Sequence, residues 1–295
     1  MSTNSERRAA AKRALDQQVE QRAQAARKQR NLLMLVGALV AVVVLAGVGF
    51  VVLHDKDPGN VNAKDATTDT SESADSEAFP AGSVGKLPTF TASPQLGADC
   101  QYQKTPRSAT KAVELPRSGK VPTDPAEVSV SMMTDQGPIG LMLTNGQSPC
   151  TVNSFISLAA KDFFNDTKCH RLTTSQTLSV LQCGDPAGDG TGGPGYEFDN
   201  EYPTDQYAST DPAAQQPVVY PRGTVAMANA GPGTNGSQFF LVYRDSMLPP
   251  QYTVFGKIQD DGLATLDKIA EAGVQGGGED GTPVTKVTVK SVRAD

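Results

Sequence analysis

The chain has 295 residues, of which 38% are hydrophobic, 20% charged and 6% aromatic, and its formal net charge is −6 at pH 7. This length allows about two average domains. Its acidic balance excludes nucleic acid as a partner, because phosphate binding needs a basic surface. The basic residues gather at the N-terminus, where residues 1–31 hold eight Lys or Arg and three acids. The rest of the chain is therefore more acidic still.

Residues 32–53 form an apolar run of 22 residues without a charged side chain. A helix rises about 1.5 Å per residue, so this run is long enough to cross a hydrocarbon core of about 30 Å. A secretory signal peptide is the alternative, but its apolar part is usually about 7 to 15 residues long and ends at a small-residue cleavage site. We favour an uncleaved transmembrane helix. The basic segment 1–31 before it predicts a cytoplasmic N-terminus, a single-pass cell-membrane anchor and an extracytoplasmic remainder.

Residues 54–95 have the composition of a linker. Acidic residues are scattered among Ser, Thr, Gly, Ala and Pro, and hardly any large apolar side chain falls between Val61 and Phe79. Such a segment buries too little surface to offset its conformational entropy. We expect a disordered acidic linker.

The pattern typical of a globular domain begins near Ala126. Alternating apolar residues over 128–132 and 139–143, joined by Asp135-Gln136-Gly137, predict a β-hairpin. Helical spacing predicts one helix that Thr151 caps and a second from Gly262 to Glu271. Further strands are expected at 180–183, 225–227, 239–243, 253–258 and 284–292. Many short strands with two helices indicate a mainly β fold, a closed antiparallel barrel with plugged ends.

Four cysteines, all beyond the apolar run, predict two disulfides in an oxidising compartment. A metal site is disfavoured because the chain has no CxxC motif. Sequence alone permits three pairings. Cys169 ends a strand-like stretch and Cys183 lies on its antiparallel return, which favours Cys169–Cys183 and leaves Cys100 for Cys150.

The stretch Met227–Phe240, MANAGPGTNGSQFF, combines Gly, Asn, Pro and Gln with two phenylalanines. Gly and Asn tolerate positive φ, so the loop has a specific backbone shape. So many hydrogen-bonding groups beside two aromatic residues favour a binding surface over the alternative, a long surface loop that only connects two elements.

Together with distant motifs, this loop resembles the cyclophilin family of peptidyl-prolyl cis/trans isomerases. The other motifs are His170-Arg171, Gln182-Cys183-Gly184-Asp185, Gly190-Thr191-Gly192-Gly193 and Val254-Phe255-Gly256-Lys257. The resemblance covers residues 126–295 and implies an eight-stranded antiparallel barrel capped by two helices. Residues 96–125 are an extension outside it, which the second disulfide would pin against the barrel.

The resemblance implies an isomerase that rotates X-Pro bonds without a covalent intermediate and without a cofactor or metal. The amide barrier is about 18 to 20 kcal/mol, and a catalyst must favour the twisted state. A permanently charged arginine can hold the substrate carbonyl and direct an N–H at the prolyl nitrogen. The residues implied to act in catalysis are Arg171, Gln182 and Asn229. Those implied to bind substrate are Met227, Ala228, Ala230, Gln238, Phe240, Leu248, Tyr252, Gly190, Thr191, Ser179 and Met247.

The chain departs from the family pattern opposite this loop. Ser179 occupies the position of a pocket phenylalanine, Met247 that of a tryptophan and Tyr252 that of a histidine; the chain has no Trp. Because that tryptophan contributes to cyclosporin binding in the family, we expect weak sensitivity to this inhibitor. The departures leave an alternative open, a membrane-tethered proline-binding chaperone module with little catalysis. A third interpretation, an unrelated β-barrel binding protein, requires the motif matches to be accidental.

The predicted topology places the domain outside the membrane, so we expect it to act on exported or cell-surface proteins whose X-Pro isomerisation limits folding. Its expected partners are proline-containing polypeptides, and we expect a monomer.

Overall fold

A computed structural model of the chain describes residues 84–106, 109–208 and 210–295. The predicted cytoplasmic segment, the predicted membrane span and the linker up to residue 83 lie outside these residues. Within the described ranges, every helix is too short or too polar to cross a membrane.

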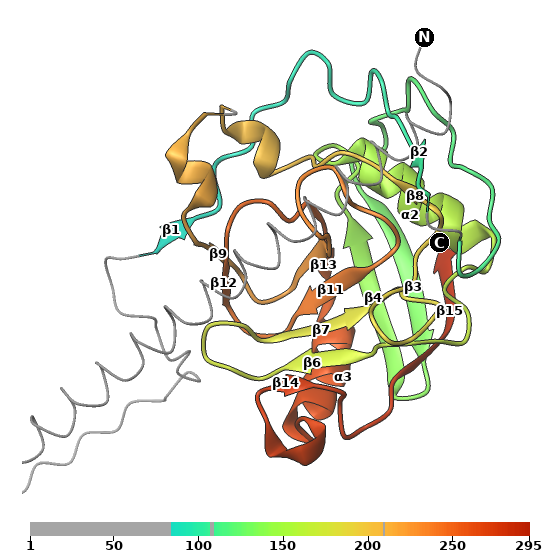
Figure 1. The fold of residues 1–295 in the computed structure, drawn as a ribbon, viewed down its shortest axis with the longest axis vertical. Helices are drawn as coiled ribbons and strands as arrows, with labels where there is room; N and C mark the ends of the chain where they lie inside the picture. Colours follow the sequence, from blue (N-terminus) through green and yellow to red (C-terminus); the bar gives the residue numbers. More distant parts are fainter. Residues whose placement is uncertain (1–83, 107–108, 209) are drawn as a thin grey trace, which may run out of the picture. The chain divides into compact units, whose positions relative to one another are not determined.

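One sheet of ten strands dominates the described part of the chain (Figure 1). Its strand order is β14-β6-β7-β11-β10-β13-β4-β3-β15-β5. The strands are β3 (Val128–Thr134), β4 (Gly137–Leu143), β5 (Thr167–Lys168), β6 (Arg171–Thr173), β7 (Val180–Cys183), β10 (Thr224–Met227), β11 (Phe239–Val242), β13 (Val254–Ile258), β14 (Asp280–Gly281) and β15 (Thr288–Ala294). The expected hairpin is confirmed, with Val128 opposite Leu143 and Thr134 opposite Gly137.

The expected barrel of eight strands is corrected to a curled sheet of ten. The additional strands include β5 and β14, each of two residues. β5 lies at one edge of the sheet and β6 next to the other, although only Cys169 and His170 separate them in the chain. The chain itself therefore passes from one edge to the other, which requires the sheet to curl.

Two helices cover this sheet, α2 (Pro149–Ala160) and α3 (Asp260–Glu271). Both begin before the predicted positions. Thr151 is not the cap of α2 but lies inside its first turn, after Pro149. The side chain of Glu201 accepts hydrogen bonds from the N–H groups of Cys150 and Thr151 at 2.9 and 2.7 Å. A carboxylate from a distant segment thus satisfies the free donors of this helix start.

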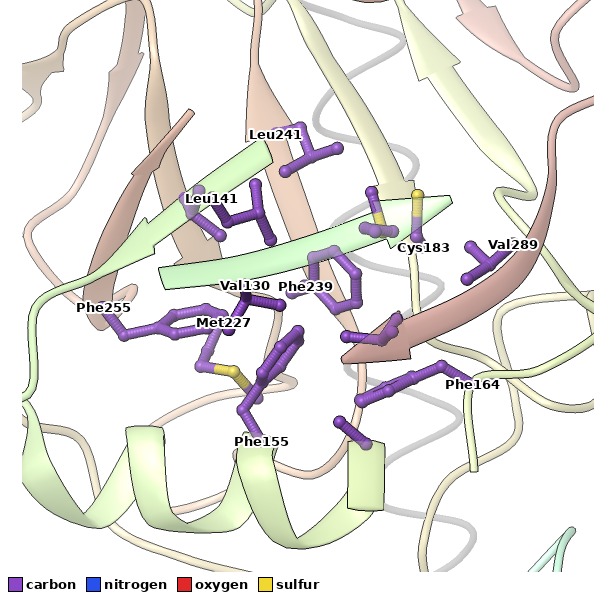
Figure 2. Packing of buried hydrophobic residues seen from close by; sticks show 14 of the residues in the cluster. Val130, Leu141, Phe155, Phe164, Cys183, Met227, Phe239, Leu241, Phe255 and Val289 are labelled. Carbon is purple, nitrogen blue, oxygen red and sulfur yellow. The ribbon is translucent and has the colours of Figure 1, made fainter. Parts of the chain in front are cut away.

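The hydrophobic core lies inside the curled sheet against α2 (Figure 2). Phe155 of α2 packs on Phe164, Phe239 and Phe255, with ring centroids 5.0 to 5.4 Å apart. Met227 lies in the same cluster and is almost fully buried. Aromatic residues of this size bury about 150 to 250 Å² each, so this group contributes a large buried area to the core.

Short elements lie around the main sheet. A three-stranded sheet joins β1 (Gly85–Lys86), β9 (Val218–Tyr220) and β12 (Ser246–Leu248), and a two-stranded sheet joins β2 (Gln103–Lys104) and β8 (Tyr196–Glu197). Three 3₁₀ turns are η1 (Thr204–Gln206), η2 (Pro212–Gln215) and η3 (Gln275–Gly277).

The folded domain begins earlier than the expected linker boundary at residue 95. β1 pairs in parallel with β9, and Phe90 packs edge-on against Tyr202 with ring centroids 5.6 Å apart. The hydroxyl of Tyr202 also donates to the carbonyl of Pro88 at 2.7 Å. We did not predict these contacts from the sequence, because residues 54–95 as a whole are acidic and contain few large apolar residues.

Both expected disulfides are confirmed, Cys100–Cys150 and Cys169–Cys183. Cys100–Cys150 joins the extension at residues 96–125 to the first turn of α2. Within the extension, Tyr102 packs on Tyr196 and Phe198, with ring centroids 5.7 and 5.5 Å apart. The extension is thus held by a covalent bond, by β2–β8 pairing and by a buried aromatic contact.

Candidate active site

Three of the side chains that we predicted to act in the site lie in one row across adjacent strands. Arg171 on β6 is directly opposite Gln182 on β7, and Gln182 is directly opposite Phe240 on β11. Directly opposed residues of an antiparallel pair share a face of the sheet. The fold therefore brings together three residues that are distant in the sequence, on the face opposite the core.

Hydrogen bonds connect the polar part of this row. Nη1 of Arg171 donates to Oε1 of Gln182 at 3.2 Å, and Nε2 of Gln182 donates to Oε1 of Gln238 at 2.9 Å. Nε2 of Gln238 in turn donates to the carbonyls of Gly190 and Gly192, both at 3.0 Å. These contacts fix the orientation of the side-chain amides of Gln182 and Gln238, because the oxygen of each amide can only accept and its NH₂ group can only donate.

Arg171 has a second partner that the sequence did not indicate. Its Nε and Nη2 atoms donate to the two carboxylate oxygens of Asp280, each at 2.7 Å. Hydrogen bonding to Asp280 raises the pKa of Arg171 above its ordinary value, and the same contact lowers the pKa of Asp280. The guanidinium is therefore charged at any physiological pH.

Phe240 forms the floor of an apolar cluster on the same face. It is 4% exposed and packs with Val180, Val242 and Val254. The ring of Tyr252 meets it edge-on, with centroids 5.8 Å apart. Leu178, Ala228 and Leu248 are half-buried around this cluster. The environment is apolar and aromatic, as a proline ring requires.

Two predicted pocket residues lie elsewhere. Met227 is opposite Phe239 and both face the core, because neighbouring residues on a strand point to opposite faces (Figure 2). Ser179 is fully buried, and its hydroxyl donates to the carbonyl of Ser175 at 2.9 Å. Val180, one residue later, lies in the cluster of Phe240 instead. Val180, and not Ser179, therefore contributes to the wall of the cluster around Phe240.

The remaining predicted residues surround the row. Met247 is half-exposed on β12, opposite Val219, and is not a member of the Phe240 cluster within the described residues. The side chain of Asn229 donates to the carbonyl of Gln251 at 2.9 Å. Its main-chain N–H and C=O have no partner within the described ranges. Asn229 can thus offer backbone groups to an extended peptide.

A cavity of about 520 Å³ adjoins this edge. Gln182, Ala228, Gln238 and the glycine-rich segment from Gly190 are among the residues that line it. Thr105 and Pro106 also line it, and both belong to the extension. Ala230 and Thr191, two of the residues that we predicted to bind substrate, are exposed at the cavity.

The shape of this cavity depends on Gly184 and Asp185. Gly184 has φ +85°, and a Cβ atom there would lie 2.2 Å from the carbonyl oxygen of Ser237, so only glycine fits. The buried carboxylate of Asp185 accepts hydrogen bonds from the N–H groups of Ala187, Asp189 and Gly190 at 2.6 to 3.0 Å. These contacts fix the loop that lines the cavity.

Sequence reasoning missed Val180 and Asp280. Strand alternation could have identified Val180, since it is two residues from Gln182 and so shares its face. No local signal identifies Asp280, which lies two residues after a run of three glycines and 109 residues after Arg171 in the chain. No cluster of three or more His, Cys, Asp or Glu side chains suited to a metal ion occurs in the described part of the chain.

Comparison with known proteins identifies the family of the chain. The family pattern described as cyclophilin type peptidyl-prolyl cis-trans isomerase/CLD matches residues 129–294, more than half of the chain. The chain therefore belongs to the cyclophilin-type peptidyl-prolyl cis-trans isomerases, and it is an enzyme of this class.

Mycobacterial proteins are similar over longer stretches. The chain is 71% identical over 209 residues to a protein of Mycobacterium tuberculosis named probable peptidyl-prolyl cis-trans isomerase B, covering 71% of this chain and 68% of that protein. It is 59% identical over 295 residues to a protein of the same name from Mycobacterium leprae, covering 100% of each. A solved cyclophilin of Cryptosporidium parvum is 28% identical, with a TM-score of 0.46, covering 57% of this chain and 98% of that chain.

Proposed function

We propose that Arg171 drives the isomerisation by stabilising the twisted X-Pro amide. Rotation breaks the amide resonance, which costs about 18 to 20 kcal/mol uncatalysed, and returns a lone pair to the prolyl nitrogen. A guanidinium has five N–H donors and does not lose its proton. It can hold the substrate carbonyl and donate to this nitrogen together, without forming a covalent bond.

The observation that carries this proposal is the row of Arg171, Gln182 and Phe240. With the proline ring on Phe240, the amide to be rotated lies toward Gln182 and Arg171, because cross-strand neighbours are about 4.5 to 5.5 Å apart. The open backbone groups of Asn229 provide a second anchor for the peptide. One end of the substrate is thus held while the other rotates.

The test is isomerisation of a proline peptide by the full-length chain, followed by exchange NMR so that kcat and KM are separated. We expect Arg171→Ala to lower kcat by about 10²-fold or more, as removal of an electrostatic donor does elsewhere. Arg171→Lys keeps the charge but not the fork of donors, so it should recover only part of the rate. Arg222→Ala, at an arginine outside the row, is the matched control. Equal rates for wild type and Arg171→Ala would exclude the mechanism.

The clients that we propose are exported or cell-surface proteins, and the location is the cell membrane with the catalytic domain outside. The basic segment before the apolar run supports this orientation. The two disulfides support an oxidising compartment.

The location can be tested on cells whose wall has been removed and whose cell membrane is intact. We expect external protease to digest the domain and the mature chain to retain residues 1–31 by intact mass. A chain that has lost these residues would indicate a cleaved signal peptide, and protection from protease would place the domain in the cytoplasm.

A further inference from the structure

Asp280 forms a clamp on the arginine of the candidate active site. Both of its carboxylate oxygens accept from Arg171, at 2.7 Å from Nε and 2.7 Å from Nη2. Such bidentate pairs fix the plane of the guanidinium as well as its position. The opposite terminal nitrogen, Nη1, has Gln182 as its sole partner among the described residues, at the longer distance of 3.2 Å.

The backbone places this carboxylate firmly. Asp280 lies on β14, opposite Thr173 of β6, the strand that carries Arg171. The carbonyl of the preceding Glu279 accepts from the N–H of Thr174 at 2.8 Å. The glycine-rich turn before β14 includes Gly276 and Gly277 at φ +81° and +74°, which allows it to return sharply to the sheet. Asp280 is thus part of the sheet edge and not the tip of a free loop.

The pairing leaves suitable donors for a substrate. Of the five guanidinium N–H groups, two point to Asp280 and one points to Gln182. One N–H on each terminal nitrogen remains without a partner within the described residues. Two donors are the number that simultaneous contact with a carbonyl oxygen and a prolyl nitrogen requires.

From this geometry we propose that Asp280 is a positioning residue for the isomerase reaction. It holds Arg171 in one orientation before substrate binds. The conformational entropy of this long side chain is therefore already lost in the free enzyme and does not add to the activation barrier. The inference rests on the proposed role of Arg171. It assigns a role in the reaction to a residue that acts through Arg171 and not through contact with the substrate.

Its test compares the full-length wild type with Asp280→Ala, Asp280→Asn and Asp280→Glu by exchange NMR of a proline peptide. We expect Asp280→Ala to lower kcat about tenfold with KM within about twofold, since a loosely held group loses transition-state contacts first. Asp280→Asn keeps one acceptor and should fall in between. Asp280→Glu restores the carboxylate and should recover most of the rate.

The protein contains its own matched control. Arg222 and Asp267 form another bidentate pair, at 2.7 and 2.8 Å, with nearly the same exposure and outside the site row. Asp267→Ala removes an equivalent surface pair, so it should leave kcat unchanged. The Nε–H signal of Arg171 should exchange faster with water in Asp280→Ala and remain unchanged in Asp267→Ala.

A double variant identifies the route of the effect. If Asp280 acts through Arg171, adding Asp280→Ala to Arg171→Ala should cause no further loss. An additional loss there would overturn the inference, as would a normal or higher kcat for Asp280→Ala alone; a higher value would make Asp280 a competitor of substrate. If Arg171→Ala is itself fully active, both the mechanism and the positioning role fail. If it is impaired while Asp280→Ala is normal, only the positioning role fails.

Discussion

Removal of Cys100–Cys150 should cost more stability than removal of Cys169–Cys183, whereas removal of Cys169–Cys183 should cost more activity. Cys100–Cys150 closes a loop of 50 residues and Cys169–Cys183 one of 14 residues. A crosslink stabilises by limiting the unfolded chain, by about 4 kcal/mol for the longer loop and about 3 kcal/mol for the shorter one at 25 °C. Either loss is large against a typical unfolding free energy of about 5 to 15 kcal/mol.

Activity should follow the geometry of the site instead. Cys169 is two residues before Arg171, and Cys183 directly follows Gln182. Cys100–Cys150 lies in the extension and at the start of α2, so the Arg171–Gln182–Phe240 row does not depend on it. We expect Cys169→Ala/Cys183→Ala to lower kcat/KM about tenfold through misplacement of the row. We expect Cys100→Ala/Cys150→Ala to remain within about twofold of wild type on a short Ala-Pro peptide.

The assay is urea unfolding of the full-length chain followed by near-ultraviolet circular dichroism, with isomerisation measured on the same preparations. Each double variant is the control for the other, because each removes two cysteines. A greater loss of unfolding free energy in Cys169→Ala/Cys183→Ala would refute the loop-entropy reasoning. A greater loss of kcat/KM in Cys100→Ala/Cys150→Ala would refute the assignment of the site to the row.

Other substitutions test the faces and charges of the site. Phe240→Ala should lower kcat/KM about fiftyfold, because it exposes three proline methylenes worth about 0.8 kcal/mol each; the adjacent Phe239→Ala should instead cost about 3 to 5 kcal/mol of unfolding free energy. Ser179→Phe should lower the melting temperature without reducing KM, since Ser179 is fully buried away from Phe240; a lower KM would contradict this. Burial raises the pKa of Glu201 from 4.5 to about 7, so the folded state binds more protons in this window. The unfolding free energy of the wild type, relative to that of Glu201→Gln, should therefore fall as pH rises from 4.5 to about 7 and then level off; a difference independent of pH would contradict the assignment.

Much of the fold and of the site was predictable from local patterns. Alternation identified the hairpin over 128–143 and the short strands of the sheet, because a strand with one buried face must alternate. The loop Met227–Phe240 was recognisable because its glycines and asparagines have no role in regular structure. The pairing Cys169–Cys183 followed from the expected antiparallel return, and the structure has it.

Faces and distant partners were less accessible. Met227 was assigned to the pocket although its strand neighbour Ala226 is the residue in the Phe240 cluster. A shift of one residue along a strand moves the side chain to the opposite face of the sheet. The sequence pattern did not indicate which residues face the core and which face the Phe240 cluster. The same error placed Ser179 in the pocket in place of Val180.

The sequence by itself determined the family, the number of cysteines and the presence of Arg171, Gln182 and Phe240, because these depend on residue identity and local spacing; it favoured one of three disulfide pairings, which the structure then showed. Only the tertiary structure decided that they form one row, that the extension lines a cavity beside them, and that Asp280 holds Arg171 by two hydrogen bonds. The physical reason is that an ion pair between residues 109 positions apart depends on strand pairing at the sheet edge. A pattern confined to neighbouring residues carries no information on that pairing.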